Sequence, residues 1–593
     1  MISSRRQVVL ALGSALAVTP FGAPNAAAAP HDGRFERLTR RWLDQSMRLG
    51  PINATQTGDH RFDSRLDDAS AAGRARTLRF AQETLRALEA IDRSQLSRAN
   101  QVDWALLANA MRSQIWSAEV SQTWAWDPLT HQTRAGDAIY NLMAREFAPM
   151  AVRLESATAR LEGMPALLAQ ARAALDPARV PTPHAETYAL QNPGVKSLIT
   201  DLIEPHKGVL SARKLERLNA AIARANAAVD EHQAWIEGTL VPNARGNFRI
   251  GAQRFDEKLA FTMQSDLTRA QIRARADAAV RDVRAEMYRV AKLALAGRAD
   301  APPTPDAPDP GQQQAAIRAA LDIAASERPR RDHLVEDATA GVNEAEAFVR
   351  ARDLITVPEG NVRVILMPEF QRGFAVAYCD SPGALERGLE TFYAVSPVPD
   401  DWSDEQATSF LREYNTRAIL DVGVHEAMPG HYVQIAHSNR YPSTLRAVLG
   451  SGTFTEGWAC YAEEMMVQQG FRANDPLYRL SQLKVQLRTV TNAILDQAIQ
   501  VDGMERAAAM QLMTQTAFQE EREAAGKWRR AQLSSTQLST YFVGFLEHME
   551  TRAEAERRAG AGFNLKAYHD GILSFGSPPM RYARALLFEE PIQ

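Results

Sequence analysis

The sequence predicts a mainly α-helical protein of two lobes, with a small β-sheet beside a cleft. Long segments rich in alanine, leucine, arginine and glutamate carry apolar residues at spacings of three and four, which is the pattern of amphipathic helices. Residues 357–395 are instead rich in β-branched and aromatic residues bounded by proline and glycine, which is typical of strands. A proline-rich segment at residues 301–311 separates the first set of helices from the rest of the chain.

An N-terminal lobe built from helices is expected over residues 30–300. Its segments with one apolar face are separated by short runs containing proline, glycine and asparagine, which interrupt helices. No repeat of fixed length stands out, so a solenoid is not expected. The clearest helical segments are residues 74–91, 151–175, 211–240 and 267–296, and breaks lie at residues 177–183, 192–194 and 243–246.

The second lobe, residues 312–593, is expected to hold the sheet and the candidate site. The preceding segment APPTPDAPDPG (301–311) is either a linker or an exposed loop between helices. The sheet either packs on the helices as a structural hairpin or offers an edge strand that pairs with the backbone of a bound peptide. Its two or three strands are predicted within residues 357–370, 373–382 and 389–395.

The overall composition excludes few classes of protein but disfavours two kinds of partner. The chain of 593 residues is 45% hydrophobic and 23% charged, with a formal net charge of −3. These values are ordinary for a globular protein with a large core. The near-neutral balance gives no electrostatic reason to expect a nucleic acid or an anionic membrane as partner.

The first 29 residues have the order of a signal peptide. The pair Arg5-Arg6 precedes an apolar run from Val8 to Val18, and small residues follow at 26–29. The arginine pair in SRRQVV indicates the twin-arginine route, and the alternative is an ordinary secretory signal with two incidental arginines. No later stretch reaches about 18 uninterrupted apolar residues. We therefore expect the mature chain in the periplasm or outside the cell, without membrane attachment once the signal is removed.

The chain has two cysteines, Cys379 and Cys460. An exported protein can join such a pair in a disulfide, although their sequence spacing does not give their separation in space. The alternative, which we favour, is that both are buried small apolar side chains.

The segment DVGVHEAMPGHYVQ (421–434) carries the candidate metal ligands His425 and His431. Zinc sites commonly use two histidines four residues apart on one helix face, with a glutamate after the first histidine. Here the spacing is six, about 600° of turn on a regular helix, which would point the two rings to different sides. Pro429 breaks or kinks the helix, and Gly430 tolerates the dihedral angles that the break requires. We hypothesise that this break brings the two imidazoles together.

A third ligand is expected from a separate helix, because a catalytic zinc takes three protein ligands and keeps one position open. Glu456, which lies 25 residues after the second histidine, is the best candidate. Gly457 is expected to let the backbone approach the metal, and Thr453 or Thr455 to cap the helix. Glu463 lies two turns further along the same face, so it either orients a ligand histidine or is an exposed helix carboxylate.

Glu426 is expected to act as a general base beside the zinc-bound water. The alternative is that Glu426 is a surface acid and the histidines belong to the core or to loops. Tyr541 is either a donor to a developing oxyanion or a core residue. His437 is interpreted as a surface residue, whereas the sequence leaves open whether His548 or His569 reaches the site.

The mature chain resembles, over essentially its whole length, the bacterial proteins grouped as domain of unknown function 885. The most specific similarities are HEAMPGHYVQ (425–434) and FTEGWACYAEE (454–464). Further matching segments are GPINATQTGDHRFD (50–63), GNFRIG (246–251), REYN (412–415) and FNLKAYHDGIL (563–573), followed by a Gly-Ser-Pro-Pro tail.

The resemblance implies a large two-lobed fold like that of helical metallopeptidases that use two histidines and a distal glutamate. It implies one zinc ion bound by His425, His431 and Glu456, with Glu426 as the base. Tyr541, with Arg530 upstream, then corresponds to a late tyrosine that stabilises the oxyanion. Residues assigned to supporting the ligands or binding substrate are Glu463, Arg530 and Gln434.

Two segments depart from the family pattern. Asp496-Gln-Ala-Ile-Gln500 stands where the family has Asp-Thr-Gly-x-His, and Ser535-Thr536-Gln537 replaces Pro-Gly-Gln before the late tyrosine. The first departure puts in doubt any role of that histidine in substrate binding or oxyanion support.

These observations together predict an exported zinc-dependent peptidase that hydrolyses short peptides. One alternative is another metal-dependent amide or ester hydrolase, because zinc, base and oxyanion donor suit any acyl transfer. A second alternative is a periplasmic binding protein that has lost activity, which the replacement at Gln500 keeps open.

Overall fold

The computed structural model describes residues 29–360, 362–368, 372 and 376–593. The predicted signal peptide lies outside the described residues apart from Ala29, so it stays a prediction. Within the described part of the chain, no helix is both long enough and apolar enough to cross a membrane.

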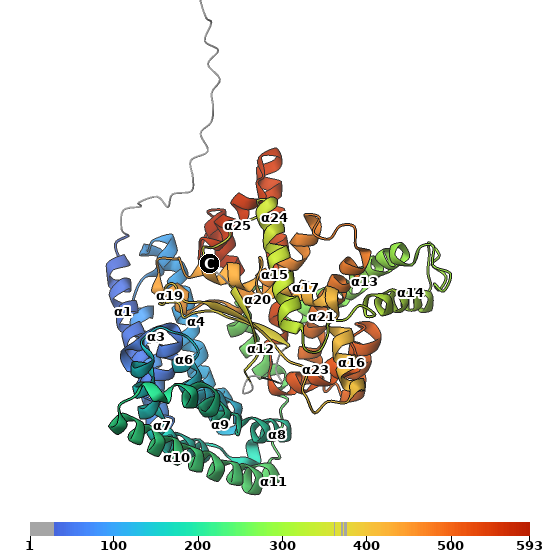
Figure 1. The fold of residues 1–593 in the computed structure, drawn as a ribbon. Coiled ribbons are helices and arrows are strands. Elements are labelled where there is room, and N and C mark those ends of the chain that lie inside the picture. Colours follow the sequence, from blue (N-terminus) through green and yellow to red (C-terminus); the bar gives the residue numbers. More distant parts are fainter. Residues whose placement is uncertain (1–28, 361, 369–371, 373–375) are drawn as a thin grey trace, which may run out of the picture.

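The fold is mainly α-helical with one three-stranded sheet, which confirms the predicted fold class (Figure 1). Residues 29–300 contain α1 (Asp32–Leu49), α2 (Pro51–Thr57), α3 (Ala71–Glu89), α4 (Arg98–Trp116), α5 (Thr123–Trp126), α6 (Leu129–Met143), α7 (Met150–Ala174), α8 (Thr182–Gln191), α9 (Gly194–Leu198), α10 (Ala212–Trp235), α11 (Val241–Asn243), α12 (Gly251–Met263) and α13 (Arg269–Leu295). The rest of the chain contains α14 (Pro310–Ala324), α15 (Leu334–Ala351), α16 (Asp404–Glu413), α17 (Thr416–Glu426), α18 (His431–Ser438), α19 (Thr444–Val448), α20 (Gly452–Gln468), α21 (Pro476–Gln500), α22 (Arg506–Gln511), α23 (Glu521–Leu533), α24 (Leu538–Ala559), α25 (Leu565–Leu573) and α26 (Met580–Leu587).

The four clearest helical predictions are confirmed as α3, α7, α10 and α13. A π-helical turn at Ile236–Leu240 continues α10 to its predicted end. The helices α7 and α10 pack side by side, as Figure 1 shows at the lower edge of the molecule. Apolar residues one or two turns apart line the contact, which is why the periodicity was readable in the sequence. They include Leu154, Leu161 and Leu168 on α7, and Leu218, Ile222 and Val229 on α10.

The proline-rich segment connects two helices that pack on the same partner. Residues 301–309 form the loop between α13 and α14, and Pro305 accepts a hydrogen bond from the hydroxyl of Tyr288 at 2.6 Å. Both helices share an apolar core with α21. Residues 251–295 therefore pack against the C-terminal helices, away from α7 and α10, and the division of the chain into two lobes at this segment stays a prediction.

The sheet contains β1 (Val362–Leu366), β2 (Ala377–Asp380) and β3 (Thr391–Val395), each inside a predicted strand region. The order is β1-β3-β2, with β1 parallel and β2 antiparallel to the central strand. All five residues of β3 are buried, which explains its uninterrupted apolar and aromatic sequence. The strand β2 is an outer strand of this sheet, and it lies beside the candidate site.

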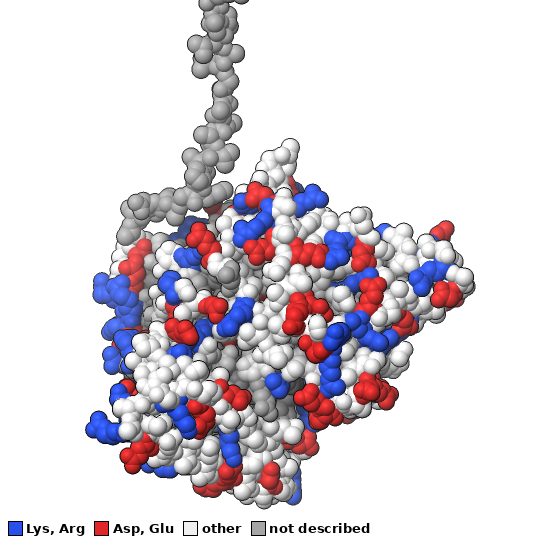
Figure 2. Space-filling view, viewed as in Figure 1, with Lys and Arg blue, Asp and Glu red and all other residues white. Residues whose placement is uncertain are grey.

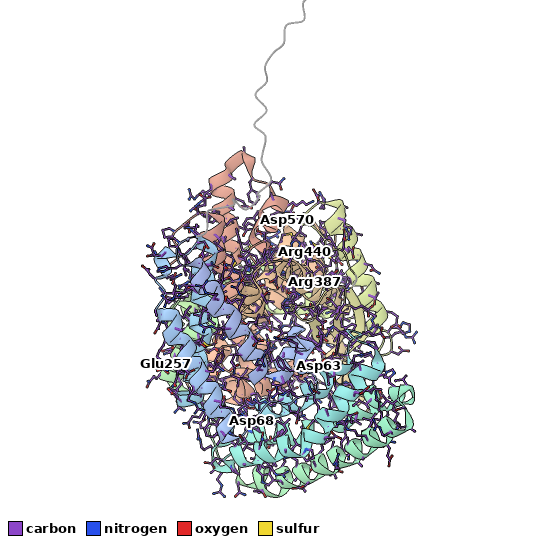
Figure 3. All side chains as sticks on the ribbon, turned by 90° about the vertical axis from the view of Figure 1, so that its left-hand side faces the viewer. Asp63, Asp68, Glu257, Arg387, Arg440 and Asp570 are labelled. Atoms are coloured by element: carbon purple, nitrogen blue, oxygen red, sulfur yellow. The ribbon has the colours of Figure 1, made fainter. Side chains whose placement is uncertain are left out.

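The N-terminal helices hold the loop that follows β2. The backbone N–H of Leu385 donates to the carbonyl of Thr57 at 2.9 Å, and His60 bridges Asp63 and Glu386 at 3.0 and 2.9 Å. A Cβ on Gly383 would lie 2.4 Å from the carbonyl carbon of Thr57, so the contact requires glycine. Figure 3 looks onto this side of the molecule and labels Asp63 and Arg387.

Charges of both signs are interspersed over the face shown in Figure 2. Surface arginines and lysines on this face alternate with acidic residues, so neighbouring charges compensate each other over short distances.

Candidate metal centre

The helix that carries His425 ends one residue later, and a new helix begins at His431. Between them the Met428–Pro429 peptide bond is cis. The N–H of Gly430 donates to the carbonyl of Val424 at 3.0 Å, which folds the chain back on the end of α17. An added Cβ at Gly430 would lie only 1.8 Å from the carbonyl oxygen of His425, so close backbone approach requires glycine here.

Trp458 of α20 fixes this break in place. Its indole N–H donates to the carbonyl of Pro429 at 2.9 Å, and its ring is fully buried. Because α20 also carries Glu456, the same helix anchors the break and supplies the third candidate ligand.

The three predicted ligands lie together. The Nε2 atoms of His425 and His431 are 3.7 and 3.5 Å from Oε2 of Glu456, and the two imidazole centroids are 4.7 Å apart. Ligand atoms bonded to a tetrahedral zinc at about 2.0–2.2 Å lie roughly 3.3–3.6 Å from one another. Oε2 of Glu456 is buried without a hydrogen-bond partner among the described residues. The donor set and its spacing therefore fit a zinc ion.

Glu463 contacts His425 on the ring nitrogen that faces away from the other two candidate ligands. Its Oε1 lies 2.6 Å from Nδ1 of His425, and the residue is 2% exposed, which excludes the exposed carboxylate that the sequence left possible. An ionised carboxylate only accepts hydrogen bonds, so Nδ1 of His425 carries the proton. In the neutral imidazole, the lone pair of Nε2 then faces Glu456, as a metal ligand requires.

The charges of these groups depend on one another. Burial favours neutral histidine, but hydrogen bonds to Cys460, Glu456 and Glu463 outweigh it and raise the pKa of His425. Burial also opposes ionisation of Glu456, yet the two nearby histidines hold the pKa of this carboxyl well below its usual range. Without a metal, positive imidazole therefore compensates the carboxylate, which is the charge that a bound cation would replace.

Glu426 lies at the end of α17 beside strand β2. The residue is buried, and it accepts a hydrogen bond from the backbone N–H of Cys379. Its Oε2 has no hydrogen-bond partner among the described residues. Burial raises the pKa of Glu426, and the nearby histidines oppose that rise. A carboxylate with a raised pKa is a better proton acceptor, as a general base needs to be.

Tyr541 lies above the ring of His425, with centroids 6.5 Å apart. Its hydroxyl oxygen accepts hydrogen bonds from Arg530 at 2.9 Å and from Gln537 at 3.3 Å. With two donors on the oxygen, the phenolic proton is left to donate to a ligand in the cavity. Gln537 was part of a segment that departs from the family pattern, and here it helps to position Tyr541.

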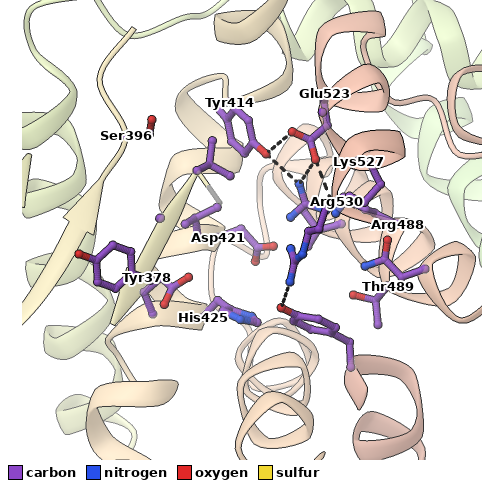
Figure 4. Close-up of a pocket in the computed structure, with 18 of the residues that line it drawn as sticks. Tyr378, Ser396, Tyr414, Asp421, His425, Arg488, Thr489, Glu523, Lys527 and Arg530 are labelled. Carbon is purple, nitrogen blue, oxygen red and sulfur yellow. Dashed lines mark hydrogen bonds and ion pairs between the residues drawn. The ribbon is translucent and has the colours of Figure 1, made fainter. Parts of the chain in front are cut away.

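These groups line one cavity of about 940 Å³ (Figure 4). Strand β2 and the ends of α17 and α18 form one side, and α20, α21, α23 and α24 form the others. Its polar lining includes Tyr414, Asp421, His425, Glu426, His431, Glu456, Glu463, Arg488, Thr489, Asn492, Glu523, Lys527, Arg530 and Tyr541.

Gln434 does not join the cavity lining. It is buried on α18, and its amide donates to the hydroxyl of Ser577 at 2.6 Å, near the C-terminus. These contacts do not support a role of Gln434 in holding the ligands or binding substrate, because its side chain points from α18 into the core. His437, on the same helix, contacts the carbonyl of Thr356 at 2.7 Å.

The late histidines are core residues that do not line the cavity. Nε2 of His548 contacts the carbonyl of Phe454 at 3.0 Å. His569 is held between the hydroxyl of Tyr461 and the carbonyl of Leu354, both at 2.7 Å.

Gln500, which replaces a family histidine, lies outside this cavity. Its amide donates to the carbonyls of Ala531 and Ser534 at 2.8 and 3.1 Å, at the end of α23. Asp496, one turn earlier, accepts two bonds from Ser539 and one from the N–H of Thr536. Gln500 therefore holds the end of α23, and Asp496 holds the start of α24. Among the described residues, neither side chain bonds to a candidate ligand.

Several local expectations need correction. Ser451 caps α20, accepting a hydrogen bond from the N–H of Phe454 at 3.3 Å, whereas Thr453 and Thr455 lie inside the helix. Gly457 faces α24: an added Cβ would lie 2.4 Å from the carbonyl carbon of Gly544. Its role is therefore to allow two helices to cross closely. Both cysteines are free, which confirms the favoured alternative to a disulfide, but only Cys460 is buried as expected, whereas Cys379 is partly buried.

The sequence predicted Arg530 as a site residue, but the charged side chains around it in the cavity, Arg488, Glu523 and Lys527, were missed. On α23, Glu523, Lys527 and Arg530 share one face, and Arg488 approaches from α21 (Figure 4). Their spacing of four and three was readable, but charged residues on a helix usually form a solvated face. Asp421, the first residue of the segment 421–434 that carries the two histidines, is also fully buried, next to Glu463.

The fold and the site define a class: a mainly helical protein with two histidines and several glutamates gathered in the lining of one cavity. The chain belongs to the family described as bacterial protein of unknown function (DUF885), whose model matches residues 51–587. Among curated proteins, no match was found.

Two solved structures share the fold. A putative lipoprotein of unknown function from Shewanella oneidensis is 32% identical, with a TM-score of 0.77 over 93% of this chain and 99% of that one. A putative lipoprotein from Colwellia psychrerythraea is 17% identical, with a TM-score of 0.75 over 94% and 98% of the two chains.

Proposed function

We propose that this protein is an exported zinc-dependent peptidase that hydrolyses short peptides. The observation that carries the proposal is the spacing of three candidate ligands. The Nε2 atoms of His425 and His431 lie 3.7 and 3.5 Å from Oε2 of Glu456. Export is supported by the signal-like N-terminus and by the descriptions of the two similar structures as lipoproteins.

A zinc ion held by these three residues would supply a Lewis acid that polarises a carbonyl group and makes bound water acidic. Glu426 takes a proton from the attacking water and returns it to the leaving amine. Tyr541 donates a hydrogen bond to the carbonyl oxygen as negative charge develops there, and Arg530 holds the hydroxyl in position. Glu463 keeps the imidazole of His425 in one tautomer and one orientation.

The shape of the cavity supports short peptides as substrates. Its volume of about 940 Å³ is at the upper end for small-ligand sites. The outer strand β2 lies along the lining, and the N–H of Cys379 already points to Glu426. An extended peptide laid along β2 would find backbone donors and acceptors there, as in strand addition.

The test is turnover of a mixed peptide library by the mature protein, followed by mass spectrometry, with zinc measured in the same preparation. We expect one zinc per chain and cleavage by the unaltered protein. Glu426→Gln should keep the zinc and lose cleavage by at least about 100-fold, because it removes the base alone.

The matched pair His431→Gln and His437→Gln checks the metal ligands. Both histidines lie on α18, but only His431 faces the centre, so only His431→Gln should lose zinc. Hydrolysis of esters or other amides without peptide cleavage would identify a different metal-dependent hydrolase. Zinc binding without any turnover would identify a binding protein instead.

A further inference from the structure

The far end of the cavity holds more positive than negative charge. Arg488, Lys527 and Arg530 line it, whereas Glu523 is the carboxylate among them. The nearby Glu413 is already bonded to Lys484 at 2.7 Å and to the N–H of Glu520 at 2.8 Å. Of the remaining carboxylates of the lining, Glu426, Glu456 and Glu463 belong to the metal centre, and Asp421 lies next to Glu463. Asp421 and Glu463 interact with Arg488 only through their charges, without a hydrogen bond among the described residues.

Two of these cations, Arg488 and Lys527, have few close hydrogen-bond partners in the protein. Among the described residues, Lys527 has no hydrogen bond to its ammonium group, and its ion pair with Glu523 is long, at 3.7 Å. Arg488 makes one side-chain hydrogen bond within that part of the chain, to the hydroxyl of Tyr414 at 3.2 Å, and lies 3.9 Å from Glu523. A buried cation normally has several close partners, so donors are left over here.

Glu523 makes no close contact with either cation, because its Oε1 lies 3.7 Å from Nζ of Lys527 and 3.9 Å from Nη1 of Arg488. Oε2 of Glu523 accepts a hydrogen bond from Tyr414 at 2.9 Å. Burial lowers the pKa of Lys527 to about 7, and Glu523 only partly opposes this. A second carboxylate, supplied by a ligand, would complete the coordination of both side chains.

We propose that Arg488 and Lys527 form a subsite for a carboxylate group of the peptide substrate, which rests on the peptidase function proposed above. A guanidinium and an ammonium on two different helices offer a two-sided clamp for one carboxylate. The carboxylate is either the C-terminus of the peptide or an acidic side chain.

The position of the subsite limits where cleavage occurs. Lys527 lies three residues before Arg530 on α23, and Arg530 contacts Tyr541, the proposed oxyanion donor. Three helical residues rise about 4.5 Å, so Lys527 lies about one turn from the residue that holds Tyr541. For a C-terminal carboxylate, this predicts cleavage near the C-terminus of the peptide.

The experiment compares matched peptides that differ only in charge. One pair has a free or an amidated C-terminus on a neutral sequence, and a second pair is amidated with glutamate or glutamine next to the cleaved bond. We expect the charged member of one pair to be cleaved with a kcat/KM at least about tenfold higher. The pair that responds identifies the source of the carboxylate. Equal cleavage within both pairs overturns the subsite.

Three variants locate the effect. Lys527→Met and Arg488→Met should each remove the preference while the amidated neutral peptide is still cleaved. Arg529→Gln removes a positive charge from the opposite, exposed face of the same helix, where it pairs with Glu186, and should keep the preference. If Lys527→Met and Arg488→Met keep the preference, the subsite is wrong.

A binding measurement separates this inference from the proposed function. Calorimetric titration of the Glu426→Gln variant with the free-acid and amide peptides, and with the glutamate and glutamine pair, needs no turnover. Tighter binding of a charged member by at least about tenfold, together with no cleavage of any peptide by the unaltered protein, would support the subsite and refute the peptidase. Cleavage of peptides without any charge preference in binding or turnover would instead support the peptidase and refute the subsite.

Discussion

At the scale of single residues, the centre depends on His425 being held from two sides. Glu463 fixes Nδ1 at 2.6 Å, and Glu456 faces Nε2 at 3.7 Å. The two glutamates lie seven residues apart on α20, so one helix face presents both of them. The imidazole of His425 therefore contacts both the third candidate ligand, Glu456, and the supporting carboxylate, Glu463.

We expect Glu463→Gln to weaken zinc binding by about 10- to 100-fold, because partners of a ligand histidine contribute that much to metal affinity. The amide is close in size to the carboxylate but is a weaker acceptor for the Nδ1–H group. Competition with a chromophoric chelator measures the change. Glu464→Gln, on the same helix but paired with Arg479, is the control that should leave zinc affinity unchanged. Equal affinities of the Glu463 variant and the unaltered protein would contradict the support role.

At the scale of elements, two helix contacts place the ligands. The break between α17 and α18 turns His431 toward His425, and the crossing of α20 and α24 brings Glu456 near Tyr541. Both contacts depend on glycines that lie against backbone atoms. At the crossing, a Cβ on Gly544 would lie 2.1 Å from the carbonyl oxygen of Thr453.

Gly457→Ala should force α20 and α24 apart, because the new Cβ would lie 2.4 Å from the carbonyl carbon of Gly544. We expect a loss of about 1–3 kcal/mol in the free energy of unfolding, as for other overpacked sites. Denaturant unfolding measures it. Gly452→Ala, at the first position of the same helix, meets nothing within 4 Å and should be neutral or slightly stabilising. A Gly457 variant as stable as the Gly452 variant would show that the helices can adjust.

At the scale of the whole molecule, the N-terminal helices stabilise the sheet edge that borders the cavity. His60 lies between Asp63 and Glu386, and the hydroxyl of Tyr140 donates to Asp380 of β2 at 2.7 Å. The segment that contains His60 is one of those that resemble the family. Through these contacts, a segment distant in sequence from the candidate ligands holds the strand that borders the cavity.

The histidine at this junction makes stability depend on pH. Burial opposes its charge, but hydrogen bonds to Asp63 and Glu386 raise the pKa of His60 from 6.5 to about 9. Because the pKa is higher in the folded state, protonated His60 adds to the free energy of unfolding. This contribution is fully present below pH 6.5, declines as the pH rises and is lost above about pH 9. Because the side chain is partly exposed, we expect about 1–2 kcal/mol.

His60→Gln should therefore cost stability at pH 6 and much less at pH 9.5, measured by urea unfolding at both values. His206→Gln, at an exposed position, is the control. A loss for His60→Gln that is the same at both pH values would mean that shape, and not charge, holds this junction.

The sequence by itself determined the helices, the strands and the residue types of the centre. Helical periodicity, the apolar run of β3 and the ring of Pro429 act over a few neighbouring residues, so they are visible without the fold. The cluster of His425, His431 and Glu456 was predictable because its chemistry requires those side chains and a break between them.

Only the tertiary structure decided which way the other side chains point. Gln434 turns to Ser577, Gly457 lies against Gly544, and Arg488 and Lys527 face a cavity although charged helix residues usually face water. Each outcome depends on how helices distant in sequence pack. The energy of that packing is shared among many apolar contacts, and no local pattern records it.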